Sequence, residues 1–511
     1  MNVIVQNFFN YSFFNLIVTV HLVIIIHKLD NILSDPSKFT KITSDPTNKI
    51  KTRANKLITA LNSAQGDIKL HKVIGDFKPG YIYGNVKIHK NNNPLRPIIS
   101  QIPTATYQLS KTLNSLITPY MPNRYCLKST NDFIDLLNSK PNSNNSIIAS
   151  LDVESLFTNV PIDPTIDIIT QCIYNHPILP PLKIPKQIIT QLLQLCTKES
   201  PFRSPSGDLY LQTDGVSMGS PLGPTFANFY MGYLEEQVFS NPQNKPHIYA
   251  RYIDDVLVQI ANETELINLK SIFENNSVLK FTYELNVNQK LPFLDVLVDS
   301  SNSQFITKVY RKPTDMGTCL NANSFCPERY KISVIHNYLN RAYKISTNWI
   351  DFNNEVDHIK QMLINNNYSN SMFDQTLNKF LQQKCNQNNN ENNKNSIKIF
   401  YHNQMHTNYK VEERVIKEIL HNNIQCNSPD DKLNIIFYYK NKRTCNLVMK
   451  NNLAPKPPIL QQTGTIYRFQ CPYPHDIPQV YIGHSQMTLL RRINYHLNNG
   501  SIRSHFSFSI I

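Results

Sequence analysis

The apolar residues between residue 83 and about residue 300 fall in short runs rich in Ile, Val, Leu and Phe. Pro and Asn separate these runs, and longer segments with apolar residues at helical spacing lie between them. Short apolar runs bounded by turn residues are typical of strands, and the longer segments are typical of amphipathic helices. The pattern therefore predicts an α+β domain, followed by a mainly helical stretch over residues 328–382.

Two breaks divide the rest of the chain. Residues 382–396, QQKCNQNNNENNKNS, are rich in Asn and carry almost nothing to bury, so they predict a linker. The sequence APKPPI, residues 454–459, marks a second break before a short C-terminal unit. The apolar run over residues 11–26 is shorter than the ~20 residues of a spanning helix. We therefore expect a packed N-terminal helix and no stable membrane partner.

Two adjacent acids, Asp254 and Asp255, interrupt the apolar run IYARYIDDVLVQI, residues 248–260. The residues on either side have strand propensity, so the acids are expected at the tip of a β-hairpin. Neighbouring carboxylates that lose hydration are unfavourable unless a cation compensates them or the turn is exposed. The four-letter pattern YIDD does not decide between these alternatives by itself.

A third acid, Asp152, lies near the end of the strand expected over residues 147–153. If this strand lies beside the hairpin, Asp152, Asp254 and Asp255 converge. Carboxylates suit Mg²⁺, which takes waters and substrate phosphates as its remaining ligands. Two such ions ~4 Å apart stabilise the attacking and leaving oxygens of a phosphoryl transfer. The three acids therefore predict a two-metal site.

Residues 211–235 join a loop rich in Gly and Pro to an amphipathic helix. Gly219 and Pro221 belong to this loop, where the backbone can approach a ligand closely. The helix has apolar residues at the spacing of one face, namely Phe226, Phe229, Tyr230, Tyr233 and Leu234. On its own this segment is more typical of a helix packed on a sheet than of a substrate site.

Positive charge is concentrated in the first part of the chain. The formal net charge is +14, and residues 1–150 hold 17 basic and 7 acidic residues, which leaves +4 for the remainder. Lys87, Lys90 and Arg96 surround a Pro-bounded turn within residues 83–100. Such a cluster is often only a solvated loop, but the asymmetry suggests a polyanionic partner, most simply nucleic acid.

Cysteine usage indicates a reducing compartment. The nine cysteines are scattered singly, and none forms a CxxC pair. This spacing argues against a disulfide framework and against a Cys-rich zinc site.

Taken in order, three motifs resemble the palm motifs of reverse transcriptases: DVESLF (152–157), GVSMGSPLGP (215–224) and YIDD (252–255). The resemblance implies a right-hand polymerase fold of fingers, palm and thumb. It implies RNA-directed DNA synthesis by two-metal-ion nucleotidyl transfer.

The same resemblance assigns roles to individual residues. Asp152 and Asp254 would be the principal metal ligands, with Asp255 in support. Phe157 would crowd the sugar 2′ position and so favour deoxynucleotides. Gly219 and Pro221 would border the incoming nucleotide and the template. In the fingers, Arg96 would neutralise the triphosphate, with Lys87 and Lys90 beside it.

Longer stretches resemble the polymerase of Penelope-like retroelements. These are YGNVKIHK with PLRPIIS, SLDVESLFTNVP, GVSMGSPLGPTFANFYM, LPFLDVLV, VYRKPTD and SFCPERYK, while NLVMKNNLAP resembles the connection to a nuclease. The resemblance covers roughly residues 70–511. It implies an RNA template, a DNA primer or target DNA, dNTPs, and two Mg²⁺ ions with Mn²⁺ as a substitute. It also implies priming at nicked chromosomal DNA, and hence a nuclear protein that is not secreted.

Residues 464–496, GTIYRFQCPYPHDIPQVYIGHSQMTLLRRINYH, resemble the start of a GIY-YIG endonuclease. The resemblance implies a small, partial α/β module. Tyr467 would lie in its first strand and Tyr481 in its second, with Arg492 and His496 on the helix that follows. Tyrosines of this kind activate water or position phosphate, and Arg492 would stabilise the charged transition state.

These expectations divide the chain into consecutive parts. They are an N-terminal segment (1–70), fingers and palm (71–319), a helical thumb (320–382), an Asn-rich linker (383–396), a connector (397–460) and the partial GIY-YIG module (461–511).

Two other functions fit parts of the pattern. A catalytically inactive, nucleic-acid-binding relic of such an element would bind template with a steep salt dependence and add no nucleotides. The short C-terminal module favours this alternative, and the three intact acids weigh against it. An RNA-templated RNA polymerase shares the acidic palm, and Phe157 weighs against that function.

Cleavage of DNA by this chain alone is not expected. The family's nuclease needs a downstream Glu to hold its metal, yet residues 493–511 contain no acid. Supercoiled plasmid incubated with the purified protein and Mg²⁺ or Mn²⁺ should therefore stay intact. Nicking that is lost in Arg492→Ala would contradict this expectation.

Overall fold

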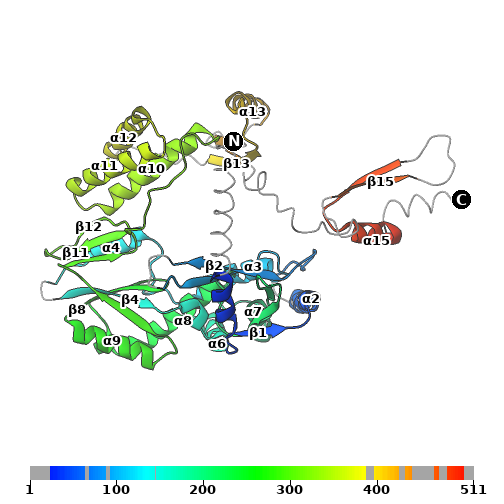
Figure 1. Ribbon diagram of the computed structural model, residues 1–511, viewed down its shortest axis with the longest axis horizontal. Helices are drawn as coiled ribbons and strands as arrows, with labels where there is room; N and C mark the ends of the chain where they lie inside the picture. Colours follow the sequence, from blue (N-terminus) through cyan, green and yellow to red (C-terminus); the bar gives the residue numbers. More distant parts are fainter. Residues whose placement is uncertain are drawn as a thin grey trace, which may run out of the picture. The chain divides into compact units, whose positions relative to one another are not determined.

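The computed structural model describes residues 24–63, 68–87, 92–143, 146–386, 396–424, 432–439, 465–470 and 480–499. The chain divides into two compact units, and Figure 1 labels many of their elements. Unit 1 comprises residues 1–127, 149–284 and 455–511, and unit 2 comprises residues 128–148 and 285–454. Each unit is thus assembled from segments that are far apart in the sequence.

Unit 1 contains a five-stranded sheet with the strand order β1-β6-β5-β2-β3. Its strands are β1 (Phe39–Ile42), β2 (Gly80–Val86), β3 (Leu95–Ser100), β5 (Phe202–Arg203) and β6 (Leu209–Gln212). β2 and β3 are antiparallel, and Asn85 lies opposite Arg96. Because side chains alternate along a strand, β2 buries Ile82 on one face and exposes Tyr81 and Tyr83 on the other.

The buried face of this sheet has its own apolar cluster. Its members are Leu29, Leu33, Phe39, Ile82, Ile99 and Phe202. The two leucines come from a helical stretch over residues 24–33. The described part of the N-terminal segment 1–70 therefore contributes to the core of unit 1. Most of the apolar run 11–26 lies outside the described residues.

A four-stranded sheet with the order β7-β8-β4-β9 also belongs to unit 1. Its strands are β4 (Ile147–Val153), β7 (Ile248–Tyr252), β8 (Asp255–Ile260) and β9 (Phe281–Leu285). β7 and β8 form the predicted antiparallel hairpin, in which Tyr252 pairs with Asp255. Ile253 and Asp254 are therefore the two residues of the turn. β4 lies beside β8, which is the arrangement that brings the acids of both strands together.

Helices accompany both sheets of unit 1. They are α2 (Thr47–Ser63), α3 (Tyr107–Ile117), α5 (Leu156–Asn159), α6 (Ile162–Tyr174), α7 (Lys186–Lys198), α8 (Gly223–Val238) and α9 (Glu263–Asn275), with the 3-10 turns η1 (Thr118–Tyr120) and η2 (Pro242–Asn244). The one-face pattern predicted for α8 was too narrow, because α8 also buries Ala227, Met231 and Glu235. Contacts with α5, α6 and α9 make α8 a central helix.

Unit 2 combines a three-stranded antiparallel sheet with helices. The strands are β10 (Lys290–Phe293), β11 (Val296–Asp299) and β12 (Ile306–Val309), and the helices are α4 (Thr130–Ser139), α10 (Glu328–Ile345), α11 (Trp349–Asn365) and α12 (Asn370–Cys385). Both α10 and α11 contact β12. The boundary expected after residue 319 therefore does not separate compact units, because the strands before it pack with the helices after it.

Smaller elements follow the helices. In unit 2, β13 (Ser396–Asn403) pairs in parallel with β14 (Lys432–Tyr439), and α13 (Tyr409–Asn423) contacts β14. Near the C-terminus, β15 (Thr465–Gln470) pairs antiparallel with β16 (Val480–Ser485), and α15 (Leu489–Asn499) follows. Residues 387–395 of the expected linker lie outside the described residues. Within the described ranges, no helix has both the length and the apolarity needed to cross a membrane.

Candidate active site

The turn between β7 and β8 brings Asp254 close to Asp152 near the end of β4. The backbone amide of Val153 donates a hydrogen bond to the carbonyl oxygen of Asp254, at 3.1 Å. Asp152 directly precedes Val153, so this bond links the two acid-bearing segments. Both carboxylates are half-buried.

The backbone of the turn is strained at Ile253. This residue has a φ of 58°, in the left-handed region that a β-branched residue rarely adopts. Such a conformation costs about 1–3 kcal/mol and persists only where the surrounding structure holds it. The surroundings of the hairpin therefore fix the peptide that carries Asp254.

The pKa of Asp254 is raised above its ordinary value. Burial is the largest cause, and the negative charge of Asp152 raises the pKa further. A hydrogen bond from its own backbone amide and the positive charges of Arg96 and Lys87 act in the opposite direction. The two acids therefore repel each other in a partly dehydrated site, and a bound cation would relieve that repulsion.

Asp255 does not join the other two acids in one cluster. It begins β8 and is exposed, whereas Asp254 belongs to the turn. Among the described residues, no group of three or more His, Cys, Asp or Glu side chains could hold a metal. The structure therefore brings Asp254 close to Asp152, and a supporting role of Asp255 stays a prediction.

Two of the predicted cations act on this pair from the five-stranded sheet. Arg96 is an exposed residue of β3, and Lys87 follows β2 directly. The charges of both affect the pKa of Asp254. Lys90 lies outside the described residues. The positive charge is thus within electrostatic range of the acids, as binding of a phosphate chain there would require.

The segment before β3 is held by a lysine that the sequence did not single out. The ammonium group of Lys28 donates to the carbonyl oxygens of Asn92 and Asn93, at 2.8 and 2.7 Å. This contact ties the helical stretch over residues 24–33 to the segment that carries Arg96.

The Gly-rich loop packs directly on β3. Gly219 has a φ of 142°, and a Cβ there would lie 2.3 Å from the carbonyl oxygen of Ile99. The amide of Ile99 donates to the carbonyl of Met218, at 3.2 Å. Pro221 follows as a half-buried residue just before α8. The sequence predicted that the backbone at Gly219 approaches a ligand closely. In the structure, the backbone of β3, the strand that carries Arg96, lies at that close distance from Gly219 instead.

Phe157 lies on α5, five residues after Asp152. Its carbonyl accepts a hydrogen bond from the amide of Val216, at 2.7 Å. A Cβ built on Gly223 would lie 3.7 Å from the half-buried Phe157 ring. Phe157 therefore contacts the Gly-rich loop and the start of α8.

Two exposed tyrosines beside Arg96 were missed by the sequence analysis. Tyr81 and Tyr83 have ring centroids 6.1 Å apart, on the face of β2 that also carries Asn85. Asn85 pairs with Arg96, and directly paired residues share a face. The alternation in GYIYGN was the available signal. Aromatic side chains beside a cation suit the bases and phosphates of an unpaired strand.

A buried ion pair between Arg251 and Glu235 was missed as well. The two side chains are 0% and 1% exposed, and the nearest N and O atoms are 2.5 Å apart. Arg251 and Glu235 each lie in an apolar stretch of the sequence. Since a buried charge needs a partner of opposite charge, this was the available signal for the pair.

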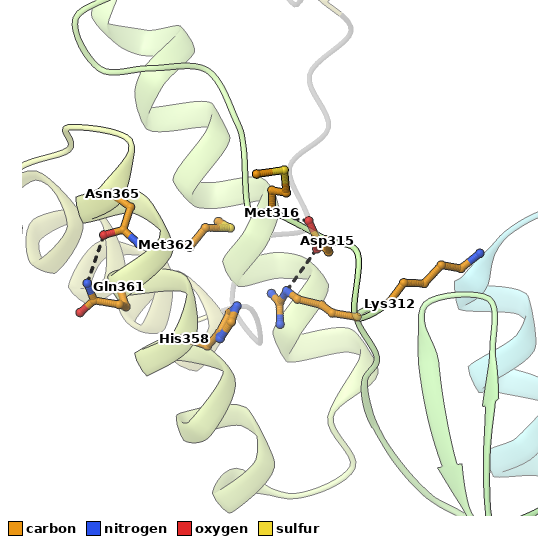
Figure 2. Close-up of a pocket in the computed structure, with 9 residues that line it drawn as sticks. Lys312, Asp315, Met316, His358, Gln361, Met362 and Asn365 are labelled. Carbon is orange, nitrogen blue, oxygen red and sulfur yellow. Dashed lines mark hydrogen bonds and ion pairs between the residues drawn. The ribbon is translucent and has the colours of Figure 1, made fainter. Parts of the chain in front are cut away.

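Unit 2 contains a cavity of about 360 Å³ between the segment 311–317 and α11, shown in Figure 2. Its guanidinium, from Arg311, is already paired with Glu355 and Asp315. None of the residues expected at the active site lines this cavity. The two acids expected to carry the chemistry, Asp152 and Asp254, lie in unit 1.

The expected nuclease residues lie on two strands and a helix. Tyr467 is on β15, Tyr481 is on β16, and Arg492 and His496 are on α15. The guanidinium carbon of Arg492 lies 5.3 Å from the ring centroid of Tyr495. His496 is buried, and its pKa is lowered by burial and by the charge of Arg492.

Residues 88–290 match the family model of reverse transcriptases, which are RNA-dependent DNA polymerases. The matched range includes Arg96, Asp152, Phe157, the Gly-rich loop and the hairpin. Residues 88–290 are therefore similar to a reverse transcriptase domain. A second family model, described as an animal helix-turn-helix domain, matches residues 318–378, which overlaps the expected thumb, residues 320–382.

Several solved polymerase structures show weak similarity to this chain. A truncated apo telomerase from Candida tropicalis is 15% identical with a TM-score of 0.35, over 50% of this chain and 60% of that chain. Telomerase from Candida albicans with a fragment of telomeric RNA is 11% identical with a TM-score of 0.41, over 67% and 62%. The Sicinivirus RNA-dependent RNA polymerase is 10% identical with a TM-score of 0.39, over 67% and 86%. The chain thus spans about 60% of the length of these telomerases, and no curated protein matches it.

The raised pKa of Asp254 predicts a pH-dependent stability effect. Ionisation of the Asp254 carboxyl is less favourable in the folded protein than in the unfolded chain. The ionised carboxyl therefore lowers the free energy of unfolding as the pH rises through its folded-state pKa. Asp254→Asn removes the ionisation and should raise the Tm in EDTA at pH 8 by on the order of a few degrees. The gain should shrink as the pH is lowered. Calorimetry at several pH values measures it.

A suitable control is Asp167→Asn, an exposed position on α6 of unit 1. Its Tm should stay close to that of the wild type, because exposed substitutions away from special features change stability little. A lower Tm for Asp254→Asn at pH 8 would contradict the repulsion between the two acids.

Proposed function

We propose that this chain is an RNA-directed DNA polymerase with Asp152 and Asp254 at its catalytic centre. The similarity of residues 88–290 to a reverse transcriptase domain supports the class of reaction. The observation that carries the residue assignment is the pairing of two half-buried acids, one near the end of β4 and one in the β7–β8 turn, within reach of the charges of Arg96 and Lys87. Acids held against their mutual repulsion are typical of sites that act with a charged ligand.

The surrounding side chains suit the proposed substrates, which are an RNA template, a DNA primer and dNTPs. Arg96 and Lys87 would bind the triphosphate through charge-assisted hydrogen bonds. Phe157 would limit space at the sugar 2′ position, with Gly219 and Pro221 bordering the nucleotide and template. Tyr81 and Tyr83 would stack with unpaired template bases.

Asp152 and Asp254 offer the hard oxygen ligands that Mg²⁺ takes, and their mutual repulsion fits a cation between them. Asp255 would support them from the start of β8. Bound metal, proposed as two Mg²⁺ ions with Mn²⁺ as a substitute, would supply stabilisation of the attacking and leaving oxygens.

We further propose that the polymerase serves a Penelope-like retroelement. The motifs that resemble this group support the proposal. In this setting, synthesis would be primed at nicked chromosomal DNA in the nucleus. Residues 461–511 would belong to a GIY-YIG module.

Primer extension tests the polymerase directly. The wild-type protein should extend a DNA primer on an RNA template with dNTPs and Mg²⁺. Asp152→Asn and Asp254→Asn should each lower the rate by at least about 10²-fold, because each removes charge needed where the transition state is stabilised. Primer-template binding should stay nearly unchanged in both variants. Asp167→Asn on α6 again serves as the exposed control.

The inactive relic predicts a different result. It would bind the primer-template with a steep salt dependence and add no nucleotide under any of these conditions. Binding without extension by the wild type would therefore favour the relic over the polymerase.

The choice of sugar tests the role of Phe157. Removing the ring in Phe157→Ala should open space for a 2′ hydroxyl and lower the dNTP preference over NTP by about 10-fold or more, as loss of steric exclusion in a pocket does. Single-nucleotide insertion with matched dNTP and NTP measures the ratio. Strong use of NTPs by the wild type would favour an RNA-templated RNA polymerase instead.

A further inference from the structure

A buried ion pair lies against the hairpin that carries Asp254. Nε of Arg251 is 2.5 Å from Oε1 of Glu235, and Nη2 is 3.2 Å from Oε2. The hydroxyl of Tyr249 donates to the same carboxylate, at 2.8 Å. A buried ion pair often stabilises a fold no better than apolar residues of the same volume. Stability alone therefore gives little reason for these charges.

Arg251 has one more nitrogen, and this one reaches the turn. Its Nη1 donates to the carbonyl oxygen of Ile253, at 3.2 Å, and to Oδ1 of Asn228 on α8, at 2.7 Å. Ile253 is the strained residue of the turn, and Asp254 follows it. A guanidinium is planar with donors in fixed directions. Since Glu235 orients the guanidinium from one side, the direction of Nη1 toward the turn is set as well.

The backbone of Arg251 is anchored separately. Its amide donates to the carbonyl of Tyr125, at 2.9 Å, and its carbonyl accepts from the amide of Leu127, at 2.7 Å. These bonds attach the end of β7 to the neighbouring segment without help from the side chain. The side chain of Arg251 therefore restrains the turn at Ile253 in addition to these backbone bonds.

We propose that Arg251, oriented by Glu235 and Asn228, is a positioning residue that holds the Ile253–Asp254 peptide so that Asp254 meets Asp152. The inference rests on the proposed function, because the geometry of the turn matters to catalysis only if the two acids act together. An ion pair that served the fold alone would have no need of a donor to the carbonyl of Ile253.

Three variants separate positioning from folding. Arg251→Met with Glu235→Leu removes both charges together, so no unpaired charge stays buried, and it removes the donor to the turn. Arg251→Lys keeps a charge for Glu235 without the planar fork that also reaches the turn. Arg311→Met with Glu355→Leu is the matched control, because Arg311 contacts both carboxylate oxygens of Glu355 in unit 2.

Two backbone amides give the readout by hydrogen exchange in the full-length protein without substrates. The amide of Val153 is bonded to the carbonyl of Asp254 and reports on the turn. The amide of Leu127 is bonded to the carbonyl of Arg251 and reports on β7. The Arg251 and Glu235 double variant should exchange about tenfold faster at Val153, the effect of losing one hydrogen bond to a charged group, with Leu127 unchanged. Arg251→Lys should show the same pattern, and the control should change neither amide.

Primer extension gives the matching kinetic result. The kcat of the Arg251 and Glu235 double variant should fall about 10²-fold, as a small misplacement of a reacting group causes, with the KM for dNTP unchanged. A higher KM with unchanged kcat would overturn the proposal, because it would indicate a role in nucleotide binding.

Further outcomes would also decide the matter. Unchanged exchange at Val153 in a folded variant would overturn the proposal, and so would faster exchange at both amides, which would indicate loss of β7. If the double variant fails to fold, Arg251→Lys decides by the same two amides. A wild-type protein that adds no nucleotides while Val153 responds would refute the proposed function and still support the hold of Arg251 on the turn.

Discussion

Electrostatic repulsion between Asp152 and Asp254 is the constraint on which the described site depends. Burial and the charge of Asp152 both raise the pKa of Asp254, so the ionised form of Asp254 is less favourable in the folded chain. The backbone bond from Val153 to Asp254 and the position of β4 between β8 and β9 keep the acids together. The buried core supplies the free energy for this, because apolar burial is the dominant favourable term in folding.

Positive charge near the acids is of two kinds. Arg96 is exposed and Lys87 is half-buried, and both act on Asp254 from the five-stranded sheet. Arg251 is buried and bonded to Glu235, Asn228 and the carbonyl of Ile253. Charge near the surface can attract a polyanion, whereas a buried guanidinium that makes four hydrogen bonds acts within the protein. The site thus combines charge for a substrate with charge for its own geometry.

Local sequence predicted the elements of the site better than their packing. The alternation of apolar residues and the acidic interruption correctly predicted the β7–β8 hairpin and the strand that carries Asp152. The exposed position of Asp255 was missed because it depends on where the turn ends and β8 begins. The pairing of Arg251 with Glu235 was missed because local patterns do not reveal which distant charges meet.

Long-range packing also explains the other differences from expectation. Phe39 and the helical stretch before it complete an apolar cluster with β2, β3 and β5, which no pattern within residues 1–70 could reveal. β12 contacts α10 and α11, so strands that precede the helical stretch 328–382 belong to the same unit as its helices. The central claim concerns Asp152 and Asp254, and anomalous diffraction tests it most directly. Crystals would be grown with Mn²⁺, a chain-terminated primer on an RNA template, and the next dNTP. The account predicts Mn²⁺ bound by carboxylate oxygens of both Asp152 and Asp254. A bound nucleotide with Mn²⁺ that contacts neither acid would contradict it.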